Sequence, residues 1–207
     1  MKLIIPASRI CFITSYSDNI EDKIIMLIEA GIKWIQYRQK NKTKREMFYE
    51  ALKLRKIAKR FGACLIINDY ADIALAVDAH GVHLGQEDLP IAEAKKILGS
   101  RIIGISTHNL EEALEAEKGG ADYIGFGSIF PTTTKDNTLV QGLDALKKIK
   151  KSVKIPVIAI GGIKADNVVH VLKTGCDGIA VSSGLIEGDI IDNAKRFINA
   201  VAFDFNP

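Results

Sequence analysis

Short apolar runs alternate with longer amphipathic segments along the whole chain. The runs have the length of β-strands, and several are apolar throughout, which is typical of buried parallel strands. The segments between them repeat apolar residues at helical spacing. Ile24, Leu27 and Ile28 show this spacing in the first such segment, and Gly31 follows it as a helix stop. This alternation predicts a parallel sheet with crossover helices.

Eight strand and helix pairs can be counted along the sequence. The predicted strands cover residues 10–14, 32–38, 64–67, 81–84, 101–105, the run through Ile124 and Phe126, 156–160 and 178–181. The predicted helices cover residues 20–30, 44–61, 73–77, a segment opened by Pro90, 110–118, 139–151, 165–174 and 190–201. Eight pairs in about two hundred residues predict an α/β fold, a single (β/α)8 TIM barrel over residues 1–207.

In a TIM barrel the carboxyl ends of the strands and the loops after them form one face, where chemical groups gather. The sequence meets this demand. Gln36, Arg38 and Lys40 are two residues apart, so on a regular strand their side chains share a face, and a buried face of this kind needs an anion. Later strands end at Asn68 and Asp69, at Ser106, at Gly161 and Gly162, and at Ser182 and Ser183. These polar groups follow the ends of the strands, whereas mainly glycine, lysine and proline stand at the opposite ends. This difference between the two ends of the strands predicts an enzyme.

The loop after the sixth strand carries three hydroxyl side chains and one cation. Residues 121–135 pass from an apolar strand to Thr132, Thr133, Thr134 and Lys135, and Pro131 blocks continuation of the strand. Threonine hydroxyls and backbone N–H groups can donate to phosphate oxygens, and a lysine supplies a compact positive charge. The loop therefore favours a phosphate contact, although an ordinary surface turn is the alternative.

Two loop carboxylates suggest a metal. Asp69 and Asp88 follow neighbouring strands and are candidate ligands of Mg²⁺, which takes one or two carboxylates together with substrate phosphate and water. Helix capping is the alternative role for aspartates in loops. With Arg38, Lys40 and Lys135, such a Mg²⁺ would supply enough positive charge to hold a pyrophosphate.

A second anion site is predicted where the last two strands end. Gly162, Ser182 and Ser183 offer backbone N–H groups there, and barrels often hold one phosphate at this place. The loop from Thr132 to Thr134 would complete this cradle. A barrel with both sites is suited to joining two phosphorylated substrates.

Composition narrows the class of partner. The net charge of +3 is too small to argue for nucleic acid, and the 47% hydrophobic content supports a real core. No long apolar segment indicates a membrane anchor or a signal peptide. Three widely spaced cysteines, Cys11, Cys64 and Cys176, are expected to be reduced and buried, which predicts a cytoplasmic protein. Apolar stripes on the barrel helices leave a homo-oligomer open.

Six motifs together resemble the thiamine phosphate synthase family over nearly the whole chain. They are IQYRQK at 35–40, IINDYADIALAVDAHGVHLGQEDLP at 66–90, GISTHN at 104–109, GFGSIFPTTTK at 125–135, IPVIAIGGI at 155–163 and GIAVSSG at 178–184. The resemblance implies condensation of a hydroxymethylpyrimidine pyrophosphate with a thiazole phosphate, plain or carboxylated, by early departure of pyrophosphate. The chain departs from the family pattern at Tyr37, Gln39, Thr133 and Ser182, which affects details of binding and leaves the reaction class standing.

Carried over by matched position, the family roles divide the candidate residues into three groups. The resemblance implies that Gln36, Tyr37, Arg38, Gln39, Lys40, Asn68, Ser106 and Lys135 contact the pyrimidine pyrophosphate, with Arg38, Lys40, Ser106 and Lys135 assisting catalysis. It implies that Thr132, Thr133, Thr134, Gly162, Ser182 and Ser183 hold the thiazole phosphate. It implies that Asp69 and Asp88 bind Mg²⁺.

Two other functions remain open. The thiazole tautomerases share the barrel and the phosphate cradle, but they carry a working histidine where this chain has Ser128, and they lack the threonine and lysine pattern of residues 132–135. A binding protein without turnover is the second alternative. His80, His83 and His108 are interpreted as structural or solvated side chains.

Overall fold

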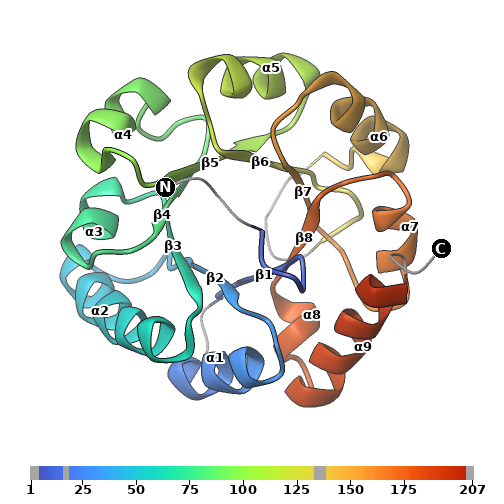
Figure 1. Cartoon of the computed structure of the whole chain (residues 1–207). Coiled ribbons are helices and arrows are strands. Elements are labelled where there is room, and N and C mark those ends of the chain that lie inside the picture. The colour runs from blue at the N-terminus through green and yellow to red at the C-terminus, as the bar shows by residue number, and fades with distance from the viewer. Residues whose placement is uncertain (1–4, 16–18, 133–138, 204–207) are drawn as a thin grey trace.

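The computed structural model describes residues 5–15, 19–132 and 139–203. Eight strands close into one barrel in sequence order, and every neighbouring pair is parallel, including β1 with β8. Figure 1 looks along this barrel, with the helices forming an outer ring. The strands are β1 (Ile10–Ile13), β2 (Trp34–Tyr37), β3 (Cys64–Asn68), β4 (Gly81–Leu84), β5 (Ile102–Thr107), β6 (Tyr123–Phe126), β7 (Val157–Ile160) and β8 (Gly178–Val181). The predicted TIM barrel is confirmed.

Helices follow the strands around the barrel. They are α1 (Ile20–Glu29), α2 (Lys44–Phe61), α3 (Ala71–Ala76), α4 (Ile91–Leu98), α5 (Leu110–Gly119), α6 (Gly142–Ser152), α7 (Val168–Leu172), α8 (Ser183–Ile186) and α9 (Ile190–Phe203). Several differ from the prediction, with α3 beginning at Ala71 rather than 73 and α6 at Gly142 rather than 139. The short helix α8 was not predicted, and α7 begins at Val168 rather than 165 because the side chain of Asn167 bonds to the preceding loop, accepting from Lys164 N and donating to Gly162 O.

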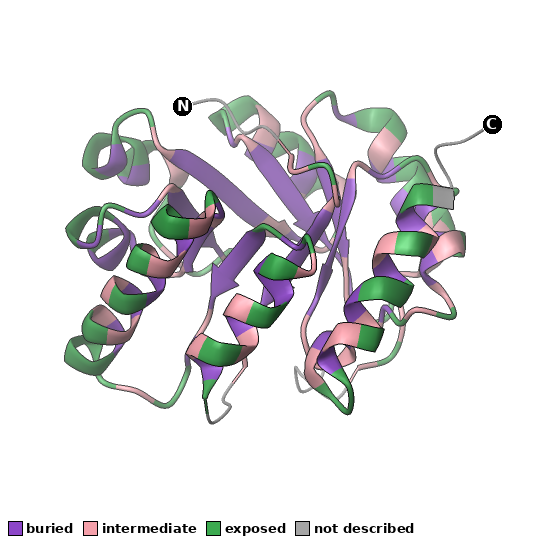
Figure 2. Cartoon of the chain, turned by 60° about the horizontal axis from the view of Figure 1, so that its bottom comes forward, coloured by how far each residue is buried: buried purple, intermediate pink, exposed green. Residues whose placement is uncertain are grey.

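The apolar core lies in two places. The larger cluster packs between the outward faces of the strands and the inward faces of the helices, with Phe12, Leu54 and Phe126 among its buried members. The smaller cluster fills the inside of the barrel around Trp34 and Tyr123, whose rings meet edge to face with centroids 5.3 Å apart. Figure 2 shows the buried strands and the helices with exposed outer faces around them. The interior of the barrel is therefore filled by side chains.

Helix α2 shows how local sequence sets an element. Thr43 and Glu46 form a capping box, in which Thr43 Oγ1 accepts from Glu46 N and Glu46 Oε2 accepts from Thr43 N. Met47, Leu54 and Ala58 lie on one face of α2 and are buried against the barrel. The helix thus begins at a fixed residue and docks along one stripe, which fixes the loop between β2 and α2.

Two structural findings concern features that were noted in the composition, the apolar segments and the cysteines. In the part of the chain that the structure describes, no helix has both the length and the apolar character required to cross a membrane. All three cysteines are free thiols; Cys11 and Cys176 are buried as predicted, whereas Cys64 is half-buried.

Truncating a leucine of the α2 stripe should destabilise the barrel far more than truncating an exposed leucine. Leu54 is 1% exposed, so Leu54→Ala leaves a cavity and should cost about 2–5 kcal/mol of unfolding free energy. Leu114 on α5 is 43% exposed, and Leu114→Ala should change that free energy by no more than about 0.5 kcal/mol. Urea unfolding followed by circular dichroism measures both, and similar losses in the two variants would contradict the packing described here.

Candidate active site

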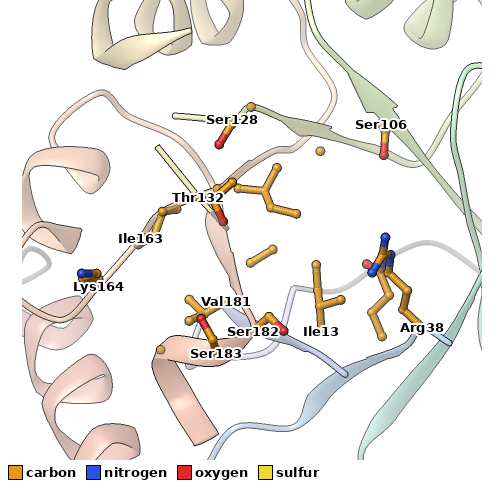
Figure 3. Close-up of a pocket in the computed structure, with 18 of the residues that line it drawn as sticks. Ile13, Arg38, Ser106, Ser128, Thr132, Ile163, Lys164, Val181, Ser182 and Ser183 are labelled. Carbon is orange, nitrogen blue, oxygen red and sulfur yellow. The ribbon is translucent and has the colours of Figure 1, made fainter. Parts of the chain in front are cut away.

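One cavity opens at the carboxyl ends of the strands and has a volume of about 880 Å³. Its lining comes from the end of every strand or the loop after it, together with two side chains of α9. Figure 3 shows Arg38 and Ser106 on one side of the cavity and Ile163 and Lys164 on the opposite side. Residues far apart in the sequence therefore meet around one space large enough for two small substrates.

Arg38 is held at its place by the end of β1. Thr14 Oγ1 accepts a hydrogen bond from Arg38 N at 2.8 Å and donates one to Arg38 O at 3.0 Å. This buried threonine extends the pairing of β1 with β2 beyond the last ladder bond. Burial lowers the pKa of the Arg38 guanidinium, and the negative charge of Asp69 opposes that change. The side chain is thus a desolvated cation near a carboxylate, with Lys40 two residues further along the same lining.

A chain of hydrogen bonds connects β2 to the end of β3. Gln36 Nε2 donates to Asn68 Oδ1 at 2.7 Å, and the side chain of Asn68 in turn donates to the carboxylate of Asp69. Asp69 has a φ of 66°, in the left-handed region, and its backbone N–H donates to His83 O. Asp69 is therefore held from two sides. Side-chain hydrogen bonds lead to it from β2, and its backbone N–H is bonded to β4.

Asp69 and Asp88 lie against each other. Burial, the charge of Asp88 and a hydrogen bond between the two carboxyl groups raise the pKa of Asp69 from 3.8 to about 6, against the opposing effects of Arg38 and Asn68. Asp88 is fixed because its Oδ2 accepts a hydrogen bond from Gly85 N at 2.6 Å. Two like charges are brought together here by the fold, which is costly without a cation or a shared proton.

This carboxylate pair fits a Mg²⁺ ion. Mg²⁺ typically uses one or two carboxylates and fills its other positions with water and substrate phosphate, so it needs no larger set of protein ligands. Within the described residues, no group of three or more histidine, cysteine, aspartate or glutamate side chains could hold a metal ion. The pKa of Asp69 is raised because burial and the charge of Asp88 outweigh the opposing charge of Arg38.

The opposite end of the cavity is built from the loops after β6, β7 and β8. Gly162 has a φ of 62°, and a Cβ there would lie 2.5 Å from Pro131 O, so this close approach of two loops admits only glycine. Asn167 Nδ2 donates to Gly162 O at 3.0 Å and holds the turn. Gly162 and Thr132 therefore line the same end of the cavity.

Ser182 and Ser183 complete this end. The Oγ atom of Ser182 is buried and has no hydrogen-bond partner among the described residues. A buried hydroxyl left unpaired costs free energy, so such an atom beside a cavity indicates a ligand that it would contact. Lys164 and Arg196 also line the cavity and were not predicted from the sequence, since Arg196 belongs to α9 and follows no strand.

His83 was interpreted as structural, yet it lines the cavity. Its Nε2 lies 2.9 Å from Ser106 Oγ and its Nδ1 lies 3.0 Å from the hydroxyl of Tyr123. The signal in the sequence was the inward parity of β4, because His83 is two residues after the inward-facing Gly81. By contrast, His108 also lines the cavity, but its Nδ1 is paired with Glu112 at 3.0 Å, which agrees with the structural interpretation.

The structure places two of the predicted contact residues away from the cavity lining and leaves three undescribed. Tyr37 is buried outside the barrel, where its hydroxyl donates to Glu50 of α2, so its side chain does not line the cavity. Gln39 is buried as well and does not belong to the described lining, so the geometry gives it no contact with a ligand. The remaining predicted residues Thr133, Thr134 and Lys135 lie outside the described residues.

Comparison with known proteins places the chain among its relatives. Residues 10–185 match the family model described as thiamine monophosphate synthase. A thiamine-phosphate synthase of Pyrococcus furiosus is 53% identical over 174 residues, which cover 84% of each chain. One from Chloroflexus aurantiacus is 47% identical over 175 residues, covering 84% of this chain and 81% of that protein. A solved thiamine phosphate pyrophosphorylase from Pyrococcus furiosus superposes with a TM-score of 0.88 at 45% identity, covering 95% and 96% of the two chains.

Removing the charge of Asp69 should stabilise the protein at neutral pH. Because its folded pKa of about 6 exceeds its ordinary 3.8, the stabilising effect of its bound proton is complete below the ordinary value and is lost as the pH rises through the folded one. Asp69→Asn abolishes that loss, and asparagine tolerates a positive φ. Without divalent cations, the variant should melt roughly 2–4 °C higher than the wild type near pH 7. The two proteins should converge near pH 4.

Asp78→Asn is the matched control. Asp78 also has a positive φ, of 55°, but hydrogen bonds from Arg101 and Arg55 lower its pKa, so its amide variant should gain no stability at pH 7. A gain for Asp69→Asn that persisted unchanged at pH 4 would show that charge is not its cause. Thermal unfolding followed by circular dichroism measures all three proteins.

Proposed function

Since the chain belongs to the thiamine monophosphate synthase family and is a transferase, we propose that its cavity joins a hydroxymethylpyrimidine pyrophosphate to a thiazole phosphate. The observation that carries this proposal is the unequal construction of the cavity. One end gathers Arg38, Lys40 and Asp69, with Asp88 next to Asp69, and the other gathers Gly162 and the Ser182 hydroxyl, which has no partner among the described residues. A pyrophosphate suits the first end and a single phosphate ester the second.

Apolar side chains in the cavity suit the two rings. Ile13, Ile160 and Val181 line the cavity together with the polar residues. Heteroaromatic rings bury well against such side chains. The fixed separation of the two phosphate sites would bring a pyrimidine methylene and a thiazole nitrogen toward each other. The affinity for the phosphate groups would then be used to orient the reacting atoms.

The reaction we propose is a dissociative substitution. The bond from the pyrimidine methylene carbon to the pyrophosphate oxygen breaks, and its electron pair leaves with the pyrophosphate. The methylene cation then accepts the lone pair of the thiazole nitrogen, which forms the new carbon–nitrogen bond of thiamine phosphate. No nucleophile of the protein is required, so catalysis rests on positioning and on charge.

Arg38, Lys40 and Ser106 would stabilise the departing pyrophosphate. A guanidinium can donate two hydrogen bonds to one phosphate group, and the lysine adds a point charge. Lys135 would contribute a further cation, as the family resemblance implies. A Mg²⁺ held by Asp69 and Asp88 would neutralise part of the charge that develops on the leaving group.

The thiazole phosphate would bind at Gly162, Ser182 and Ser183, and Thr132, Thr133 and Thr134 would close around it. Ser182 Oγ would gain a hydrogen-bond partner there, which it lacks within the described part of the chain. Lys164 and Arg196 also line the cavity and would add positive charge to the backbone N–H groups of this cradle.

One observation separates this proposal from a tautomerase. Ser128 stands where tautomerases carry a working histidine, and its Oγ donates to Phe130 O at 2.7 Å. The serine is 3% exposed and is used to shape the loop after β6. This position offers no base for moving a proton on the thiazole ring.

Release of pyrophosphate should require both substrates and a divalent cation. A coupled assay for inorganic pyrophosphate with Mg²⁺ should give a signal only when pyrimidine pyrophosphate and thiazole phosphate are both present. Chelation of Mg²⁺ should abolish the signal. Isomerisation of a carboxythiazole phosphate without pyrimidine would indicate a tautomerase, and ligand uptake without turnover would indicate a binding protein.

Removing the Arg38 guanidinium should slow the reaction. Arg38→Met keeps the length of the side chain but removes both its charge and its donors, and kcat should fall by about 10²–10³, the loss typical of a group that stabilises developing negative charge. Arg60→Met on the exposed side of α2 is the control and should leave kcat unchanged. Equal rates for Arg38→Met and the wild type would exclude Arg38 from the pyrophosphate site.

A further inference from the structure

Tyr123, His83 and Ser106 form a continuous hydrogen-bonded chain from the inside of the barrel to the cavity. The Tyr123 hydroxyl lies 3.0 Å from His83 Nδ1, and His83 Nε2 lies 2.9 Å from Ser106 Oγ. Tyr123 is 2% exposed and His83 is 6% exposed, whereas Ser106 lines the cavity. These two hydrogen bonds therefore connect a buried hydroxyl, through an imidazole, to a second hydroxyl that a ligand can reach.

The barrel makes room for this chain. In the parallel register His83 of β4 is level with Gly104 of β5, and Gly104 is level with Tyr123 of β6. A Cβ on Gly104 would lie 2.1 Å from Tyr123 Cζ, so only glycine at this position admits the phenol ring. Tyr123 also packs edge to face on Trp34. The phenol is thus fixed by neighbours on two sides.

The direction of each hydrogen bond follows from the burial of Tyr123. Among the described residues His83 is the sole hydrogen-bond partner of the Tyr123 hydroxyl. A buried O–H without an acceptor is costly, so the hydroxyl donates to Nδ1, which must then carry no proton. A neutral imidazole with a bare Nδ1 carries its proton on Nε2 and donates it to Ser106 Oγ.

This direction decides what Ser106 can do. Its oxygen accepts from His83, so its own O–H is left to donate elsewhere, and the cavity is the space that it lines. An anionic oxygen is the acceptor that such a donor binds best. The opposite tautomer would turn the Ser106 O–H toward Nε2 and present only lone pairs to the cavity.

We propose that Tyr123 and His83 are positioning residues that fix the Ser106 hydroxyl as a hydrogen-bond donor to a diphosphate oxygen. This inference rests on the proposed function for the identity of the ligand, and it deepens that function by assigning two residues that act through a third. Tyr123 does not itself line the cavity, so it would not touch the ligand. Its effect would pass through His83.

The first test examines the tautomer and needs no substrate. A long-range ¹H–¹⁵N spectrum of histidine-labelled protein should show His83 with its proton on Nε2, the signal being assigned by its loss in His83→Asn. In Tyr123→Phe, which keeps the ring and removes the donor, the Nδ1 resonance should move. A proton on Nδ1 of His83 in the wild type would overturn the inference.

The second test measures whether Tyr123 acts through Ser106. With Mg²⁺ and inorganic pyrophosphate as the probe, calorimetry should give a Kd about tenfold weaker for Tyr123→Phe than for the wild type. In a Ser106→Ala background, Tyr123→Phe should change that Kd less than twofold, because the hydroxyl that it orients is gone. A merely structural role would weaken binding by the same factor in both backgrounds, and that result would overturn the inference.

The controls separate this inference from the proposed function. Tyr49→Phe on the exposed face of α2 should leave the Kd for pyrophosphate unchanged. Failure of the wild type to release pyrophosphate from the two substrates would refute the proposed function, whereas the tautomer and the pyrophosphate Kd values would still decide the role of Tyr123. With an active wild type, the same substitutions should lower kcat/KM in the same pattern, about tenfold alone and less than twofold without the Ser106 hydroxyl.

Discussion

Closure of the parallel barrel is the constraint on which the rest of the structure depends. Every strand pairs on both sides and every pair is parallel, so all eight strands deliver their carboxyl ends to one rim. The polar groups at that rim are then fixed by bonds that extend the ladders. Thr14 extends the pairing of β1 with β2 and holds the backbone of Arg38, and Gln36 connects β2 to Asn68 on β3. Side chains can therefore be presented to a ligand by backbone that is already ordered, which reduces the entropy lost when a ligand binds.

The same rigidity allows unfavourable charge to be held in place. Gly85 N donates to Asp88 on one side, and on the other Gln36 donates to Asn68, which precedes Asp69. Burial and the charge of Asp88 raise the pKa of Asp69, so ionising both carboxyl groups here is unfavourable. A cation would offset this repulsion, and the arrangement would therefore favour binding of positive charge. Stability and affinity are opposed at this pair, which is common where a site is organised before its ligand arrives.

Sequence alone predicted the barrel and most of the rim because both follow from periodicity. Alternating apolar runs specify parallel strands, and parity along β2 places Gln36 and Arg38 on one face. The same parity puts Tyr37 one residue out of phase with Arg38, so its side chain lies away from the cavity and its hydroxyl pairs with Glu50 of α2. The bond between His83 and Tyr123 joins residues forty positions apart on strands that are not neighbours. It depends on barrel register and on the space at Gly104, which no local pattern specifies. Arg196 was missed for a similar reason, because a helix on the outer ring reaches the rim only after the barrel has closed.

The inside of the barrel shows how packing and chemistry share one core. Cys11, Ile66 and Ile102 fill it as apolar side chains do in other barrels, but Tyr123 and His83 bring polar groups into the same layer. A buried polar pair costs desolvation, and it adds to stability only if every donor finds an acceptor. Here that condition can be met only if the last donor of the chain, the Ser106 hydroxyl, faces out of the barrel and into the cavity. The requirement that the interior satisfy its own hydrogen bonds therefore sets the polarity of a group at the site, and packing far below the rim becomes part of how the rim recognises an anion.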